Sequence, residues 1–220
     1  MKTTVIISRH SEPFRKLLGE YRALEIEQIT NEKNILSVNG EIKAQKLSEH
    51  KELQNVDYIC SSHYVRAMST AKYIAERNNI VLNVDSRFGE RKFGVDSMEE
   101  LSQDFFIKQA KDWDYKLDKG ESLNEVNTRM IEAFNEVFEQ NIGKKIVIVS
   151  HGTALTVMLS NLCDVKVNEE TQVFEIYFKD VLIFSGSWAA PEMFKLEFDD
   201  YELINIEIII SYFFFLIVYW

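Results

Sequence analysis

Two short aliphatic runs in this chain each end in a histidine. Residues Thr3–Ser8 read TTVIIS and lead into Arg9 and His10, and Lys145–Ser150 read KIVIVS and lead into His151. Such runs are typical of strands that are covered on both faces, as the strands of a parallel sheet are. The sequence therefore predicts two buried strands, each with a histidine at its carboxyl end.

Predicted strands alternate with predicted helices along the chain. Two further strands are predicted over Val56–Ser62 and Ile80–Asp85. Apolar periodicity predicts helices over residues 41–53, 64–78, 122–140 and 152–163. This alternation indicates an α/β fold, a three-layer sandwich with a mostly parallel central sheet flanked by helices.

The longest predicted helix begins with a recognisable cap. Ser122 and Glu125 are spaced as in a capping box. Its apolar residues recur on one face, which we expect in the core: Val126, Met130, Phe134, Val137 and Phe138. In the segment 41–53, Ile42, Leu47 and Leu53 are expected to face inward.

The later part of the chain is less regular. Residues 173–178 and 181–186 predict a hairpin, and the stretches Phe14–Ser37 and Lys92–Lys119 are candidates for lids over a site. We expect one domain over residues 1–202 and a separate apolar tail over 203–220. The tail is short for a spanning helix, which needs about 20 apolar residues. A terminal strand, a disordered end and an altered reading frame are therefore preferred over a membrane anchor.

The charge balance argues against a nucleic-acid binder. The chain has 35 acidic and 25 basic residues and a net charge of -10, whereas a general nucleic-acid binder needs a basic face. A small anionic substrate is still compatible, because a few arginines can set the field of a cleft. Cys60 and Cys163 are expected to be free thiols, and a cytoplasmic location is expected because no signal-peptide pattern precedes the first strand.

Several reactive side chains follow the ends of different predicted strands. Ligands of α/β sheets gather at the carboxyl edge of the strands, so we expect these residues in one place: Arg9, His10, Ser62, Arg66, Glu90 and His151. Guanidinium groups match phosphate oxygens, and a neutral histidine can attack phosphorus. Histidines that bind a metal are a weaker alternative, because no H-x-H or H-E-x-x-H spacing occurs.

Five segments in this order resemble the histidine phosphatase superfamily, in its phosphoglycerate mutase-like branch. SRHSE is similar to the R-H-G-E box, and SSHYVRAMSTA to S-S-x-x-x-R-A-x-x-T-A. FGERKFG, GESLNEVNTR and VSHGT resemble the remaining segments of the family. The resemblance covers Val5 to Thr153, and it implies a phosphoglycerate mutase-like fold.

The resemblance also implies a role for each matching residue. His10 would be the nucleophile that forms a phosphohistidine, and Glu90 would be the proton donor. Arg9, Arg66 and His151 would hold the phosphoryl oxygens, with Ser62 and Lys16 as further substrate-binding candidates. No metal and no cofactor would be required. Lys16, Arg22 or Lys92 is also expected to contact a second anionic group of the substrate.

Departures from the family pattern favour hydrolysis. Lys16 stands where mutase-type members commonly carry an asparagine, and the mutase continuation after Glu12 is missing. We therefore expect a phosphatase acting on a small phosphorylated substrate, with no nucleic-acid or membrane partner. The sequence makes no prediction of the oligomeric state. A phosphoglycerate mutase and a non-catalytic module that binds a phosphorylated ligand are the alternatives.

Overall fold

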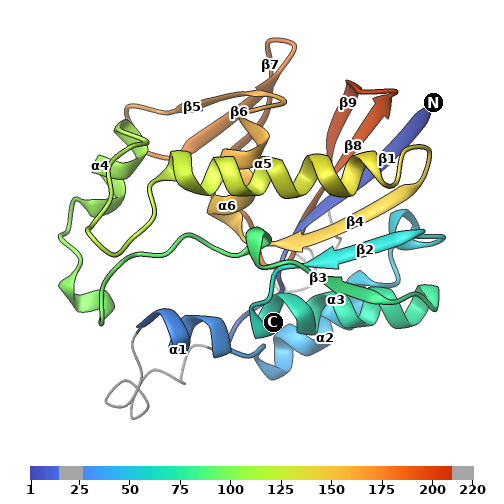
Figure 1. Cartoon of the computed structure of the whole chain (residues 1–220), viewed down its shortest axis with the longest axis horizontal. Coiled ribbons are helices and arrows are strands. Elements are labelled where there is room, and N and C mark those ends of the chain that lie inside the picture. The colour runs from blue at the N-terminus through green and yellow to red at the C-terminus, as the bar shows by residue number, and fades with distance from the viewer. Residues whose placement is uncertain (15–26, 210–220) are drawn as a thin grey trace, which may run out of the picture.

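A six-stranded sheet forms the centre of the molecule (Figure 1). The computed structural model describes residues 1–14 and 27–209. The strand order is β3-β2-β4-β1-β8-β9. The strands, with their bounds, are β1 (Lys2–Arg9), β2 (Tyr58–Ser61), β3 (Leu82–Val84), β4 (Lys145–Ser150), β8 (Glu192–Asp199) and β9 (Glu202–Ile209). The first four are parallel, and β8 is antiparallel to both β1 and β9. The expectation of a mostly parallel sheet is confirmed.

Helices cover both faces of this sheet, as expected for a three-layer sandwich. Successive residues of a strand point to opposite faces. Val5 and Ile7 of β1 therefore lie in one core cluster with α5 (Leu123–Glu139) and α6 (Gly152–Leu159). Ile6 lies in the other core cluster, which is built on α2 (Val38–Leu47) and α3 (Val65–Asn78).

A second, smaller sheet lies beside α6. It contains β5 (Asp164–Val167), β6 (Phe174–Phe178) and β7 (Val181–Gly186), all antiparallel, and the β6–β7 pair confirms the predicted hairpin. The remaining helices are short: α1 (Glu27–Lys33), α4 (Phe105–Lys111), η2 (Lys51–Leu53), η3 (Ser86–Phe88) and η4 (Met98–Glu100). Figure 1 shows α4 next to β5 and α1 below the carboxyl end of β2.

Several sequence predictions need correction. The predicted strands over 56–62 and 80–85 are shorter, and the strand β8 was not predicted at all. Ile42 is 48% exposed, so its predicted inward orientation is wrong, whereas Leu47 and Leu53 are buried. Residues 203–209, assigned to the tail, form most of β9, and residues 210–220 lie outside the described part. In the described ranges, no helix is long and apolar enough to cross a bilayer.

Candidate active site

The carboxyl ends of β1, β2 and β4 meet at one edge of the sheet. Main-chain hydrogen bonds continue past these ends, since His10 N donates to Ser150 O at 2.9 Å and Ser62 N donates to Val149 O at 2.9 Å. His151 follows β4 directly and caps α6. The backbone thus fixes three of the predicted site residues before any side-chain contact is considered.

Arg66 joins the two histidines. Its Nε lies 3.0 Å from His10 Nε2, and its Nη2 lies 3.3 Å from His151 Nδ1. The two imidazole rings have centroids 5.1 Å apart. All three side chains are buried, and Ser62 Oγ lies 2.8 Å from His151 Nε2. The structure therefore brings together four of the residues that the sequence assigned to one site.

The hydrogen bonds assign the tautomer of each histidine. Arg66 donates to His10 Nε2, so the proton of this ring is on Nδ1, which donates to Ser11 O at 2.6 Å. By the same reasoning His151 carries its proton on Nε2, which donates to Ser62. Burial, followed by the charges of Arg66 and neighbouring groups, holds the pKa of both histidines well below the usual value. Both rings are therefore neutral at pH 7.

Contacts between α3 and the loop after β1 fix Arg66 itself. Thr70 Oγ1 donates to Arg66 O at 2.8 Å and accepts from Ser11 N at 2.9 Å. Ser11 Oγ donates in turn to Gly40 O at 2.7 Å. A Cβ on Gly40 would lie 2.1 Å from Glu12 O, so only glycine allows α2 to approach this loop. Burial lowers the pKa of Arg66 to about 10, which still leaves its guanidinium charged at pH 7.

Tyr64 also belongs to this site, although the sequence analysis did not identify it. Its ring centroid lies 4.5 Å from that of His151, and Arg66 Cζ lies 4.7 Å from the centroid of its ring. Its hydroxyl accepts a hydrogen bond from Gln28 Nε2 of α1 at 3.0 Å. Residue 64 falls at an unspecified position of the family segment, so no pattern in the sequence pointed to it.

Arg9 and Glu90 line a cavity next to the histidines. This cavity has a volume of about 200 Å³, and residues of β6, β7, α6 and the segment before β8 complete its lining. The Arg9 guanidinium donates to the main-chain carbonyl of Trp188. The structure therefore places Arg9 and Glu90 on the same cavity. Neither of them takes part in the hydrogen bonds by which Arg66 joins the two histidines.

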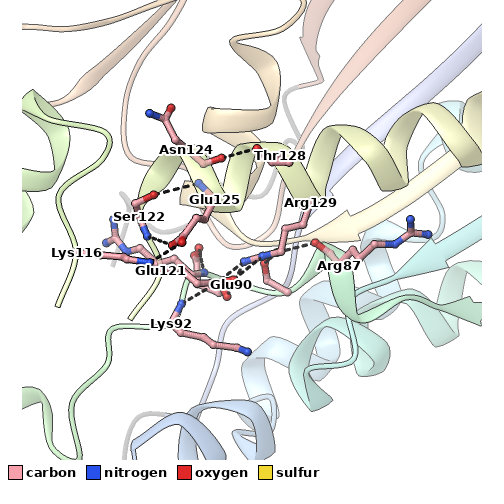
Figure 2. A network of polar contacts seen from close by, with 12 residues as sticks. Arg87, Glu90, Lys92, Lys116, Glu121, Ser122, Asn124, Glu125, Thr128 and Arg129 are labelled. Carbon is pink, nitrogen blue, oxygen red and sulfur yellow. Dashed lines mark hydrogen bonds and ion pairs between the residues drawn. The ribbon is translucent and has the colours of Figure 1, made fainter. Parts of the chain in front are cut away.

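A side-chain clamp holds the main chain around Glu90. Arg129 of α5 donates to three carbonyls, those of Arg87 at 2.6 Å, Gly89 at 2.9 Å and Glu90 at 3.2 Å. Its other edge pairs with both carboxylate oxygens of Glu121, at 2.9 and 3.0 Å. Figure 2 shows Arg129 reaching from α5 to this loop with Glu121 beside it. Neither Glu121 nor Arg129 was predicted from the sequence to take part in the site.

Three basic residues were predicted to contact a second anionic group of the substrate, and the structure describes only one of them. Lys16 and Arg22 lie outside the described residues. Lys92 is exposed and lines a separate cavity of about 150 Å³ with Asn31 of α1. The carbonyl of Asn31 accepts a hydrogen bond from Arg66 Nη1 at 2.5 Å. The α1 segment, predicted as a lid stretch, therefore contacts the central arginine directly.

Known proteins share both the sequence pattern and the fold. A probable phosphoglycerate mutase of Serratia proteamaculans is 31% identical over 136 residues, which cover 58% of this chain and 62% of that protein. The chain thus spans less than two thirds of the length of this curated relative.

Solved structures establish the fold independently. Mycobacterial glucosyl-3-phosphoglycerate phosphatase has a TM-score of 0.70 at 18% identity, covering 94% of this chain and 97% of that one. A phosphoserine phosphatase mutant of Entamoeba histolytica has a TM-score of 0.57 at 24% identity, covering 83% and 96%. The model of the histidine phosphatase superfamily (branch 1) matches residues 5–176. This protein therefore belongs to branch 1 of the histidine phosphatase superfamily.

Proposed function

We propose that this protein hydrolyses phosphate monoesters through a phosphohistidine on His10. The observation that supports this most directly is the contact of Arg66 with His10 Nε2 at 3.0 Å, in a buried setting that keeps the ring neutral. A neutral imidazole has a lone pair that can attack phosphorus without prior loss of a proton. Arg66 and Arg9 supply positive charge for the phosphoryl oxygens in the transition state.

The reaction proceeds in two balanced steps. In the first step His10 Nε2 attacks the phosphorus, the ester P–O bond breaks, and Glu90 gives its proton to the departing alkoxide. In the second step Glu90 takes a proton from water, whose oxygen attacks the phosphohistidine. The P–N bond then breaks, which releases inorganic phosphate and the neutral imidazole. Arg66 must shift from His10 Nε2 to the phosphoryl oxygens when substrate enters.

Phosphoryl transfer of the mutase type is the second candidate. It is favoured by the relative named as a probable phosphoglycerate mutase. Hydrolysis is supported by the fold relatives named as phosphatases of glucosyl-3-phosphoglycerate and phosphoserine, and by the missing mutase continuation after Glu12. Assaying the interconversion of 3-phosphoglycerate and 2-phosphoglycerate beside phosphate release separates the two activities.

The decisive experiment traps the intermediate. The protein is mixed with p-nitrophenyl phosphate, quenched in alkali and digested, and the peptides are analysed by mass spectrometry. We expect one phosphoryl group on the peptide that contains His10, and we expect acid to remove it. A chelator should leave the rate unchanged, because the arginines meet the phosphoryl charge. Phosphate binding without any phosphoenzyme would instead indicate a non-catalytic binding module.

A further inference from the structure

The cavity beside Glu90 continues into a second cavity. The second one has a volume of about 190 Å³, and it shares four lining residues with the first: Thr153, Phe174, Gly186 and Ser187. Phe174 lies at the start of β6, and Gly186 ends β7, so the small sheet forms a wall common to both. A molecule whose reacting group lies at Glu90 can therefore extend along this wall.

The far part of the second cavity combines apolar side chains with one cation. Phe106, Leu123 and Val173 line it together with Arg91. The Arg91 guanidinium packs over the rings of Phe93 and Phe106, with Cζ 5.0 and 5.1 Å from the two ring centroids. Such a lining suits an apolar or aromatic group better than a small polyol.

Arg91 has only one side-chain hydrogen-bond partner in the described ranges, and that partner is neutral. Its Nη1 donates to Gln109 Oε1 at 2.9 Å. Gln109 is fully buried, and its amide nitrogen donates to the carbonyls of Tyr115 and Glu121, so its oxygen is fixed toward Arg91. Arg91 Nε is buried without an acceptor. A cation held in this way still has its Nη2 donor to offer to an oxygen of a carboxylate or phosphate.

We propose that the second cavity receives the alcohol part of the substrate, and that Arg91 binds a second anionic group on it. This proposal rests on the proposed phosphatase activity and deepens it. The substrate class is a phosphate monoester of an apolar or aromatic alcohol that also carries a carboxylate or a further phosphate. An anionic oxygen at Arg91 satisfies a desolvated donor, and the rings of Phe106 and Phe174 contact the apolar body.

The experiment compares phenyl phosphate with 4-carboxyphenyl phosphate, which differ by one carboxylate. The quantity measured is the ratio of their kcat/KM values in the same preparation, so the fraction of folded protein cancels. In the wild type we expect the carboxylate to raise kcat/KM about tenfold or more, mainly through KM. In Arg91→Gln we expect this ratio to fall. It should then differ by no more than about twofold from the ratio that the chemical reactivities of the two esters alone would give.

Two further variants keep the test specific. Arg77→Gln removes the same charge from an arginine at the far end of α3, which pairs with Glu49, and it should keep the wild-type ratio. Phe174→Ala should lower kcat/KM for both aryl esters relative to methyl phosphate, because it removes the shared wall.

Each other outcome has a definite meaning. Loss of the ratio in Lys92→Gln but not in Arg91→Gln would assign the anion to a different cation and overturn the proposal. Equal kcat/KM values for both esters in the wild type would also overturn it, while leaving the phosphatase activity intact. If the wild type hydrolyses neither ester and forms no phosphoenzyme, the proposed function itself fails.

Discussion

The proposed catalytic centre around His10 and the Glu90 loop are held in place by different means. His10, Ser62 and His151 follow directly on paired strands, and main-chain hydrogen bonds to the neighbouring strand fix the first two. Glu90 lies beyond the short η3 helix, where no strand pairing continues. Its main chain depends on Arg129, a side chain that reaches across from α5 (Figure 2).

This difference separates two parts of the proposed chemistry. His10, the proposed nucleophile, lies directly after a paired strand, so a substitution there should affect the reaction and leave its neighbours in position. The main chain of Glu90, the proposed proton donor, is held by Arg129, which in turn pairs with Glu121, and the two side chains of this ion pair are 19% and 17% exposed. Substitutions in the clamp should therefore act on protonation of the leaving group, and substitutions in the centre on phosphoryl transfer itself.

The largest expected effect is in the centre. His10→Ala should lower kcat for p-nitrophenyl phosphate by about 10⁴-fold or more, because it removes the proposed nucleophile. The matched control is His50→Ala, since His50 caps the short η2 helix and makes no contact with the site. The control should retain nearly full kcat. Substantial turnover by His10→Ala would remove His10 from the nucleophilic role.

The clamp should give a smaller and more selective effect. Arg129→Gln should lower kcat for an alkyl phosphate by about 10²-fold, within the range expected for a misplaced general acid. The loss should be much smaller for p-nitrophenyl phosphate, whose leaving group scarcely needs a proton.

Arg87→Gln is the matched control for the clamp. Its guanidinium pairs with Asp85 and Glu136 at the surface, and only its main-chain carbonyl takes part in the clamp. It should leave both rates within about twofold, as expected for an exposed ion pair. Equal losses with both esters in Arg129→Gln would contradict a role through Glu90.

The sequence predicted that His10, Arg66 and His151 lie together, because the placement of these residues depends on local patterns. The aliphatic runs that form β1 and β4 also deliver His10 and His151, so finding the strand locates the residue. Arg66 could be placed because it lies in the first turn of α3, directly after β2. Parallel pairing then brings these ends together by a general rule of α/β sheets.

The rest depended on contacts between distant segments. Strand β8 carries Glu192, Lys195 and Glu197, which interrupt the apolar pattern, yet it pairs with β1 and β9 inside the sheet. Lys195 is stabilised there by ion pairs with glutamates on neighbouring elements. The Arg129 clamp and the cavity at Arg91 likewise join residues that no periodicity connects, so only the folded chain shows them.

Acid should lower the stability of the folded protein through the two buried histidines. Burial, followed by nearby arginine charge, holds the pKa of His10 and His151 well below the unfolded value of 6.5. Below pH 6.5 the unfolded chain therefore binds protons that the folded chain does not, so stability is lost as pH falls. Each histidine contributes a slope of up to about 1.4 kcal/mol per pH unit.

Urea unfolding between pH 7.5 and 5.5 measures this slope. Burial raises the pKa of Glu192, which acts on stability in the opposite sense as pH falls, so a variant comparison is needed. His151→Gln should reduce the slope by about the share of one histidine. An unchanged slope would mean that His151 is not held neutral in the folded protein.

The smallest expected effect concerns the helix that carries the clamp. Ser122 Oγ accepts from Glu125 N at 3.1 Å, and Glu125 Oε2 accepts from Ser122 N at 2.9 Å, which closes the predicted capping box. Ser122→Ala should lower the free energy of unfolding by about 1 kcal/mol and Tm by about 2–4 °C.

Thr128→Ala is the matched control. Thr128 lies in the middle of the same helix with its side chain exposed to solvent, and at such a position alanine is the better helix former. It should leave Tm unchanged or raise it slightly. Since the Arg129–Glu121 pair stays intact in Ser122→Ala, its kcat for an alkyl phosphate should remain within about twofold of the wild type. A loss of kcat as large as that of Arg129→Gln would show that the cap, and not the ion pair, sets the position of Glu90.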